Sequence, residues 1–358
     1  MERKFIKSFF IRSIVLLVAA IAVVVIFDPF FEYHKPLKGL KAVLTDKEYQ
    51  CVGSLRNFDY DSVIVGSSVT ENNYNAWYNE GFDCNVIKAV RSYGATADLC
   101  YLLDIAYETH DLKYVFYNID PSALCADPEP TYELTGSPTF LYDKNYINDV
   151  EYVLNKSVIF EKIPYLIANS FMGDYDENNS YNWAQWKEFN SDMALGLYIR
   201  KPSIAPMKEK DYYQNQLDAN ISLLTNEVSA HPETSFKIFI PPYSMLWWDN
   251  LYRTGDTEAY LYNMEQALGT LLQYENVEIY YFQNIEEIIT NLENYMDIIH
   301  FAPEINQFMC EQMAEGNYRV TLDNYEKEIE AMRTLSYHIV NDRMGQYEDQ
   351  IKVDTAVE

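Results

Sequence analysis

The feature that most constrains the fold of this chain is a regular alternation of short apolar runs with longer amphipathic segments. Each run holds six or seven residues rich in Val, Ile, Phe and Tyr, which is typical of strands buried on both faces of a sheet. The segments between the runs carry apolar residues at helical spacing, as in residues 95–110. The five runs are residues 61–66, 85–90, 113–119, 236–241 and 277–282.

This alternation predicts an α/β fold with a mostly parallel, five-stranded sheet. Right-handed crossovers between the strands would make it a three-layer, doubly wound, flavodoxin-like sandwich. We expect residues 58–341 to form this domain, with residues 122–210 as a mainly helical insertion that could cover a site. Ligands of such sheets bind beyond the carboxyl ends of the strands, so the residues after each run are the candidates for a site. Helices are expected from about residue 70 and over residues 95–110, 211–229, 257–274, 286–294 and 303–315.

The N-terminal segment predicts a membrane anchor. Residues 9–27 are apolar except for Arg12, and this length approaches the ~20 residues that cross a bilayer as a helix. Arg12 lies near one end, where its side chain can reach the headgroups. The basic residues of the flank 1–8 should stay cytoplasmic, which places the rest of the chain outside the cell. Residues 28–57 are then a stalk, and residues 342–358 are a charged tail.

Two other interpretations of this segment remain open. One is a cleaved signal peptide, although no small-x-small cleavage site follows the apolar run, where the sequence reads Asp28-Pro29-Phe30-Phe31. The other is a helix buried in a protein core. Five scattered cysteines leave open either one disulfide or free buried thiols.

The amino-acid composition limits the kinds of ligand that the chain is expected to bind. A net charge of −27 argues against nucleic acid, because phosphate binding needs a surplus of Lys and Arg on one face. No His, Asp or Glu cluster has metal-ligand spacing, and we expect neither a metal nor another cofactor. Tyrosine, with 32 copies, can stack on sugars, but compositional bias and core packing explain it as well.

A short polar motif, Gly66-Ser67-Ser68, follows the first run. Glycine permits a tight turn, and the serines then stand at the start of a helix, whose N-terminus stabilises an alkoxide or an oxyanion. A serine that merely caps the helix is the alternative. After the second run, Gly94 opens the next helix, and its backbone N–H is expected to point into the same cleft.

A second motif, Asp297-x-x-His300, comes shortly before the predicted helix 303–315. Residues three apart can meet within one turn, so the carboxylate of Asp297 can hold Nδ1–H of His300. Nε2 of His300 is then free to take a proton from a serine. The chain has only five histidines, which makes this placement informative.

An aromatic cluster follows the fourth run. Tyr243, Trp247 and Trp248 come directly after the predicted strand 236–241, so they are candidates to line a substrate groove. Packing in the core or under a lid is the alternative.

Taken together, Gly-Ser-Ser after the first strand and Asp-x-x-His after the fifth resemble the SGNH (GDSL-like) hydrolase superfamily over about residues 58–315. The resemblance implies Ser68 as nucleophile, with Ser67 in place of the usual Asp, His300 as base and Asp297 as its orienter. Gly94 matches the glycine that donates to the oxyanion together with the Ser68 N–H.

The family's third oxyanion donor, an Asn in a Gly-x-Asn-Asp context, corresponds to Asn118. Here Asn118 lies inside Tyr117-Asn-Ile-Asp120, within the predicted third strand. Asn72 and Asn73, soon after the nucleophile, are alternative donors. Because loss of one donor can lower the rate by ~10²–10³, this departure bears on activity.

The membrane-anchored Gly-Ser-Ser branch resembles DltD-like proteins of teichoic-acid D-alanylation and proteins of polysaccharide O-acetylation. The resemblance implies a serine esterase or O-acyltransferase that acts on acyl esters of a cell-envelope polysaccharide or teichoic acid, beside a membrane-bound O-acyltransferase. Two alternatives remain: a catalytically inactive domain that binds a glycan, and an assembly partner of the membrane acyltransferase.

Overall fold

The computed structural model describes residues 2–120 and 122–354, which fall into two compact units. Unit 1 comprises Met1–Asp59 and Tyr132–Tyr181, and unit 2 comprises Tyr60–Thr131 and Asn182–Glu358. The segment 28–57 belongs to unit 1, and the segment 122–210 is divided between the units. Met1 of the predicted flank and residues 355–358 of the predicted tail lie outside the described residues.

Unit 2 is built on a mostly parallel sheet with the strand order β2-β1-β3-β5-β6-β7. The first four pairings in this order are parallel, and β6 pairs with β7 in the antiparallel sense. All five predicted strands are present, with each start and each end within one residue of its predicted position. The strands are β1 (Ser62–Gly66), β2 (Val86–Val90), β3 (Tyr114–Asn118), β5 (Ser235–Ile240), β6 (Val277–Tyr281) and β7 (Arg319–Val320).

The expected count of five strands in this sheet is wrong, because β7 adds a sixth. With only two residues, β7 is too short to show the alternation by which strands are recognised in a sequence. The same holds for β4 (Ile199–Arg200) and β8 (Lys352–Val353), which pair in parallel as a separate small sheet.

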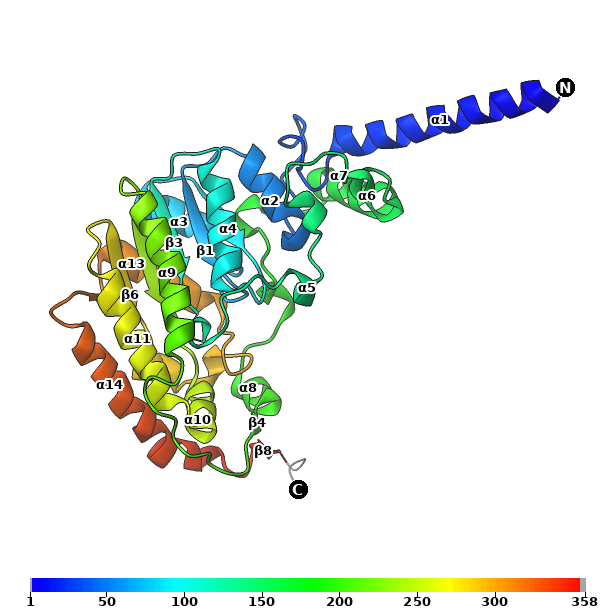
Figure 1. The fold of residues 1–358 in the computed structure, drawn as a ribbon. Coiled ribbons are helices and arrows are strands. Elements are labelled where there is room, and N and C mark those ends of the chain that lie inside the picture. The colour runs from blue at the N-terminus through cyan, green and yellow to red at the C-terminus, as the bar shows by residue number, and fades with distance from the viewer. Residues whose placement is uncertain (1, 121, 355–358) are drawn as a thin grey trace. The chain divides into compact units, whose positions relative to one another are not determined.

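The expected helices of unit 2 are present in whole or in part, but the helix expected from about residue 70 begins at Asn75, and α10 and α14 were not predicted. Strands β1 and β2 are buried along their whole length, as expected for parallel strands that are shielded on both sides. Helices α4, α9 and α11 lie side by side, and α3 packs on α13 (Figure 1). The expected helix 303–315 is α13. The helices are α3 (Asn75–Phe82), α4 (Thr96–Tyr107), α8 (Ser191–Leu197), α9 (Gln214–Ala230), α10 (Met245–Thr254), α11 (Thr257–Leu271), α12 (Glu286–Ile289), α13 (Pro303–Glu315) and α14 (Tyr325–His338).

Unit 1 is helical in the residues described. Its first helix, α1 (Glu2–Phe27), is long and apolar enough to cross a membrane, and almost none of its apolar stretch is buried in the protein. A helix in the core of this chain would be buried, so that interpretation of the segment is wrong. The remaining elements are α2 (Lys47–Asn57), α5 (Tyr132–Thr135), α6 (Val150–Val153), a π-helical turn η3 (Val158–Lys162) and α7 (Ile163–Phe171).

Candidate active site

A tight turn after β1 presents the serine pair. An added Cβ at Gly66 would overlap the Thr70 hydroxyl and come within 2.9 Å of Asn118 Cβ, so only glycine fits. The N–H of Thr70 donates to Ser67 O at 2.9 Å and closes the turn. Ser68 is left half-buried just beyond the carboxyl end of β1.

The structure brings Ser68, His300 and Asp297 together. Ser68 Oγ lies 2.8 Å from His300 Nε2, and His300 Nδ1 lies 2.7 Å from Asp297 Oδ2. Because a carboxylate only accepts, Nδ1 must carry the proton, and the neutral ring then offers Nε2 as an acceptor to the Ser68 hydroxyl. This is the arrangement of a nucleophile, a general base and the group that orients the base.

Asp297 is held in its charged form. Its Oδ1 accepts the backbone N–H groups of Ile299 at 2.9 Å and His300 at 2.8 Å. Burial alone would raise the pKa of Asp297, but hydrogen bonds from the His300 ring and from these two N–H groups outweigh it and lower the pKa. An ionised Asp297 at neutral pH stabilises the imidazolium that forms when His300 takes a proton.

The loop that carries this pair is fixed at both ends. Tyr295 and Phe301 form an antiparallel bridge, and the buried Tyr295 hydroxyl donates to Pro242 O at 2.8 Å. From the segment after β5, Ser244 donates to Ile298 O through both its N–H, at 3.2 Å, and its hydroxyl, at 2.8 Å. These contacts position His300 without touching its ring.

Trp183 is a site residue that the motifs did not reveal. Its Nε1–H donates to Ser68 O at 2.9 Å, and its ring meets the His300 ring edge-on, with centroids 5.1 Å apart. Asn72 Oδ1 accepts the N–H groups of Trp183 at 3.2 Å and Ala184 at 3.1 Å, which ties this segment to the nucleophile turn. Trp183 lies in the segment 122–210, where the sequence offers no periodic signal that would single it out.

The predicted oxyanion donors are only partly available. The Ser68 N–H has no hydrogen-bond partner among the residues that the structure describes. The Gly94 N–H, in contrast, donates to Arg91 O at 3.1 Å within a turn. The Asn118 amide is buried and donates to Thr70 Oγ1 at 2.8 Å, so it supports the nucleophile turn.

The two alternative donors differ from each other. Asn73 donates to Thr70 O at 2.9 Å and accepts from the Tyr78 hydroxyl at 3.0 Å, which makes it a structural residue. Asn72 Nδ2 is buried and has no partner within residues 2–120 and 122–354. A buried amide donor without a partner is costly, and of the two alternative asparagines only Asn72 has a donor to spare.

Asp120 is a second residue that the motifs did not assign to the site. It follows β3, and its Oδ1 accepts the Tyr243 hydroxyl at 2.9 Å. Burial raises the pKa of Asp120, against hydrogen bonds from Ser67 and Tyr243 and the influence of His300. Asp120 therefore shares the electrostatic environment of the base, and its position after a strand was the available signal.

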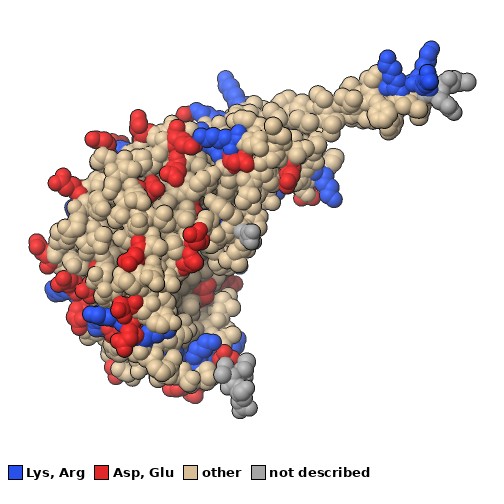
Figure 2. All heavy atoms as spheres, viewed as in Figure 1, with Lys and Arg blue, Asp and Glu red and all other residues tan. Residues whose placement is uncertain are grey.

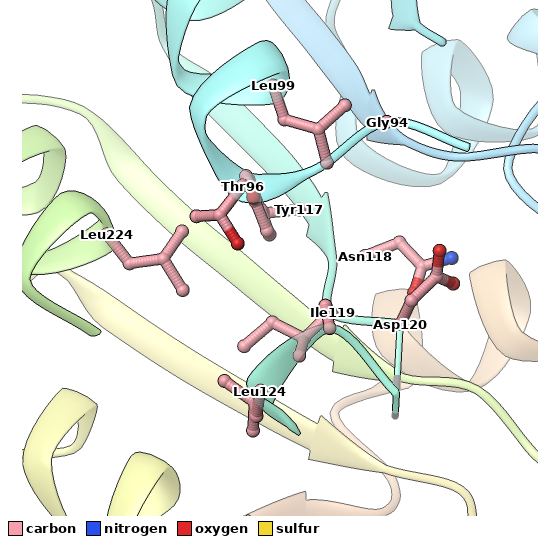
Figure 3. A pocket seen from close by; sticks show the side chains of 10 residues that line it. Gly94, Thr96, Leu99, Tyr117, Asn118, Ile119, Asp120, Leu124 and Leu224 are labelled. Atoms are coloured by element: carbon pink, nitrogen blue, oxygen red, sulfur yellow. The ribbon is translucent and has the colours of Figure 1, made fainter. Parts of the chain in front are cut away.

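A small cavity lies beside Asp120. Figure 3 shows Asn118 and Asp120 on one side of it and Leu224 on the other, with Gly94 at its edge. Its volume of about 10 Å³ holds one water molecule. The cavity is too small for a substrate, which must reach Ser68 from the exposed side of the turn.

The predicted substrate groove of Tyr243, Trp247 and Trp248 is wrong, because these side chains are buried. Trp248 is 0 % exposed, and Trp247 packs its ring at 4.9 Å from Trp248 and at 4.8 Å from Tyr260. The cluster is the apolar face of α10 packed into the core. Tyr243 still contributes to the site, through its hydrogen bond to Asp120.

Two charged residues, Lys88 and Glu71, help to hold the nucleophile turn in place. The fully buried Lys88 of β2 donates to Glu71 O at 2.7 Å, and the Glu71 carboxylate accepts the Ser92 hydroxyl at 2.9 Å. Burial, opposed by the charge of Glu71, lowers the pKa of Lys88 to about 7. These contacts tie the turn to the segment that follows β2.

In the described part of the chain, no group of three or more His, Cys, Asp or Glu side chains has the arrangement of a metal site. The five cysteines are all free thiols. No protein-family model matches the chain, and a search of curated proteins finds no significant similarity.

Proposed function

We propose that this chain is a serine esterase or O-acyltransferase of the SGNH (GDSL-like) type. The observation that carries the proposal is the continuous hydrogen-bonded path Ser68–His300–Asp297, with separations of 2.8 and 2.7 Å. Ser68 and His300 come from segments 232 residues apart in the sequence. Hydrogen-bond reach between a nucleophile, a base and an orienting group is the signature of covalent catalysis.

The chemistry proceeds in two halves. Ser68 Oγ attacks the carbonyl carbon of an ester while His300 Nε2 takes the hydroxyl proton. The tetrahedral oxyanion is stabilised by the Ser68 N–H and a second donor, for which Asn72 Nδ2 is available. His300 returns the proton to the leaving alcohol as the C–O bond breaks, leaving acyl-Ser68. Water then gives hydrolysis, and a sugar or polyol hydroxyl gives acyl transfer.

The proposed architecture is a three-layer, flavodoxin-like sandwich. The order β2-β1-β3-β5-β6 corresponds to the doubly wound order 2-1-3-4-5. The row of α4, α9 and α11 and the pair of α3 and α13 would be the two helical layers. In such a fold the site lies beyond the carboxyl ends of the strands, where Ser68, Asp120 and Ser244 follow β1, β3 and β5.

The proposed location is the outer face of a cell membrane, with α1 as a single-pass anchor. Figure 2 shows Lys and Arg side chains toward the N-terminal end of α1, and the last basic residue of the helix is Arg12. Basic residues on this side favour a cytoplasmic N-terminus and an extracellular catalytic domain. We therefore propose acyl esters of a cell-envelope polysaccharide or teichoic acid as the substrate, and a membrane-bound O-acyltransferase as a partner.

The test is a serine substitution in the purified full chain. Ser68→Ala should lower the rate of nitrophenyl acetate hydrolysis by at least ~10³-fold, because the nucleophile is lost. Ser122→Ala, which changes an exposed serine of the same unit, is the matched control and should keep the wild-type rate. Equal rates for the two variants would sink the proposal.

One observation favours a second candidate, an inactive glycan-binding or assembly protein with the same fold. The Gly94 N–H is engaged in a turn and the Asn118 amide in a contact with Thr70, so two of the three predicted oxyanion donors are occupied. A fluorophosphonate probe separates the candidates. Stoichiometric labelling that is lost in Ser68→Ala supports the enzyme, and absence of labelling supports the inactive protein.

A further inference from the structure

One face of the outer end of α1 is covered by protein, although Val23 and Ile26 there and almost all of the preceding helix are exposed. Leu16, in the middle of α1, is 70 % exposed, whereas Val24 is fully buried. Helix α6 and the turn η3 pack against α1, and Figure 1 shows α6 beside the end of α1 that enters unit 1. The covered apolar side chains of α1 begin at Ala20.

Hydrogen bonds fix this arrangement. The Tyr152 hydroxyl of α6 donates to Asp28 Oδ1 at 2.7 Å and accepts the Phe30 N–H at 3.1 Å. The Phe30 and Tyr152 rings stack at 4.9 Å. Helix α6 is therefore joined rigidly to the turn in which α1 ends, and it cannot move away from α1 without breaking buried contacts.

The depth of α6 follows from the position of Arg12. A hydrocarbon core of about 30 Å takes ~20 helical residues at about 1.5 Å each. Arg12 sits where its side chain can still reach the inner headgroups, so the apolar span extends outward to Phe27. Residues from Ala20 to Phe27 then occupy the outermost ~10 Å of the core. Because α6 and η3 lie alongside these residues, they lie at the same depth.

Exposed apolar side chains in α6, in η3 and in the loop before α6 fit that depth, and the exposed Glu151 and Glu161 of the same elements must reach the headgroups. Ile147 is 86 % exposed, Val150 is 50 % exposed and Phe160 is 76 % exposed. Large apolar side chains with this exposure are costly in water, and several of them on segments close in sequence favour a surface that binds something apolar. The neighbouring Tyr146 is also exposed, and tyrosine favours the boundary between lipid and water.

We infer that unit 1 is partly immersed in the outer leaflet, with Ile147, Val150 and Phe160 in contact with lipid acyl chains beside α1. This inference rests on the proposed anchor. Burial of amphipathic elements by 5–10 Å at the interface is a known mode of membrane attachment, and here it would supplement a spanning helix. A second contact besides α1 would restrict the tilt and rotation of unit 1 on the bilayer.

The experiment places a fluorescent label at single positions of the full chain in phosphatidylcholine vesicles. Ile147→Cys and Phe160→Cys, each labelled with an environment-sensitive dye, should be quenched at least ~2-fold more by nitroxide on the lipid acyl chain than by aqueous iodide. Leu322→Cys, an exposed apolar position in unit 2, is the control for a label in water. The native thiols are buried or half-buried, and the unmodified chain measures their background labelling.

A third label separates this inference from the anchor itself. Leu16→Cys lies at mid-helix and must be quenched by lipid nitroxide if α1 spans the bilayer. Quenching at Leu16 with iodide access at Ile147 and Phe160 would overturn the immersion of unit 1 and leave the anchor intact. Iodide access at all three positions would overturn both.

Discussion

Two carboxylates withdrawn from water, Asp297 of unit 2 and Asp28 of unit 1, have pKa values shifted in opposite directions. In unit 2, Asp297 accepts three hydrogen bonds and its pKa is lowered. In unit 1, Asp28 accepts hydrogen bonds from three backbone N–H groups and from Tyr152, yet burial raises its pKa. Its neighbour Glu32 follows the same direction: burial, opposed by Arg56, raises its pKa to about 8.

The difference teaches that donors alone do not keep a carboxylate charged. Asp28 is fully buried, and Asp149 and Glu32 add further acidic groups near it. Asp297 keeps about a fifth of its side chain in contact with solvent and accepts a hydrogen bond from the ring of His300. Residual solvation together with an imidazole partner thus maintains the ionised carboxylate that base catalysis requires. Asp28 has no exposed surface and Glu32 pairs with Arg56 instead of a histidine, so both lack this combination, and their pKa values are raised.

The largest expected effect on activity comes from neutralising Asp297, the carboxylate that stays ionised. In Asp297→Asn the amide can donate to His300 Nδ1, which favours the wrong tautomer and leaves Nε2 protonated. We expect kcat for ester hydrolysis to fall by about 10⁴-fold with little change in KM. Steady-state kinetics of the purified full chain measures this.

The control for this variant is Asp323→Asn, which changes an exposed carboxylate of the same unit and should leave the rate unchanged. Folding is checked by comparing thermal unfolding of the two variants. If Asp297→Asn retained more than a tenth of the wild-type kcat, the charge on this carboxylate would have no part in the reaction.

The acids of unit 1 provide the next test, because their shift predicts a dependence of stability on pH. The folded state binds a proton on Glu32 more tightly than the unfolded state does between pH 4.5 and about 8. The free energy of unfolding should therefore fall as pH rises through this window, with a slope approaching 1.4 kcal/mol per pH unit at most, about one proton. Glu32→Gln should flatten the slope and raise the unfolding temperature at pH 8 more than at pH 5.

Thermal unfolding of the full chain in lipid nanodiscs across this pH range provides the measurement. Asp174→Asn, which changes an exposed acid of unit 1, should keep the wild-type slope. A wild-type chain whose stability rises between pH 5 and pH 8, or a Glu32→Gln variant with an unchanged slope, contradicts the assignment of Glu32 as a protonated buried acid.

The sequence predicted the strands and the residues that follow them best, because the apolar pattern of a strand and the geometry of a parallel sheet both constrain these positions. The apolar runs located the strands because parallel strands are buried on both faces, and the motif residues Ser68, Asp297 and His300 were found at the loops that follow strands. Trp183 could not be found in this way, because it reaches Ser68 across 115 residues from a segment without periodicity. Whether an aromatic residue after a strand faces a groove or the core depends on the packing of the next helix, and so Trp248 was misplaced.

The smallest expected effect on kcat comes from substituting Trp183. This residue bears on the nucleophile turn in the way that the hydrogen-bond donors around Asp297 bear on its carboxylate. Asp297 is held by dedicated donors, and the Nε1–H of Trp183 is the corresponding donor to Ser68 O at 2.9 Å. Trp183→Phe removes this donor but keeps an aromatic ring against His300, so kcat should fall about 5- to 10-fold, as for the loss of one hydrogen bond of about 1 kcal/mol. Trp183→Ala also removes the ring and should lower kcat further.

Trp186→Phe, at a site that is 78 % exposed, is the matched control and should leave the rate unchanged. Equal rates for the two Phe variants would show that the segment carrying Trp183 merely lies near the site, and that the order of the Ser68 turn depends on the contacts beneath it.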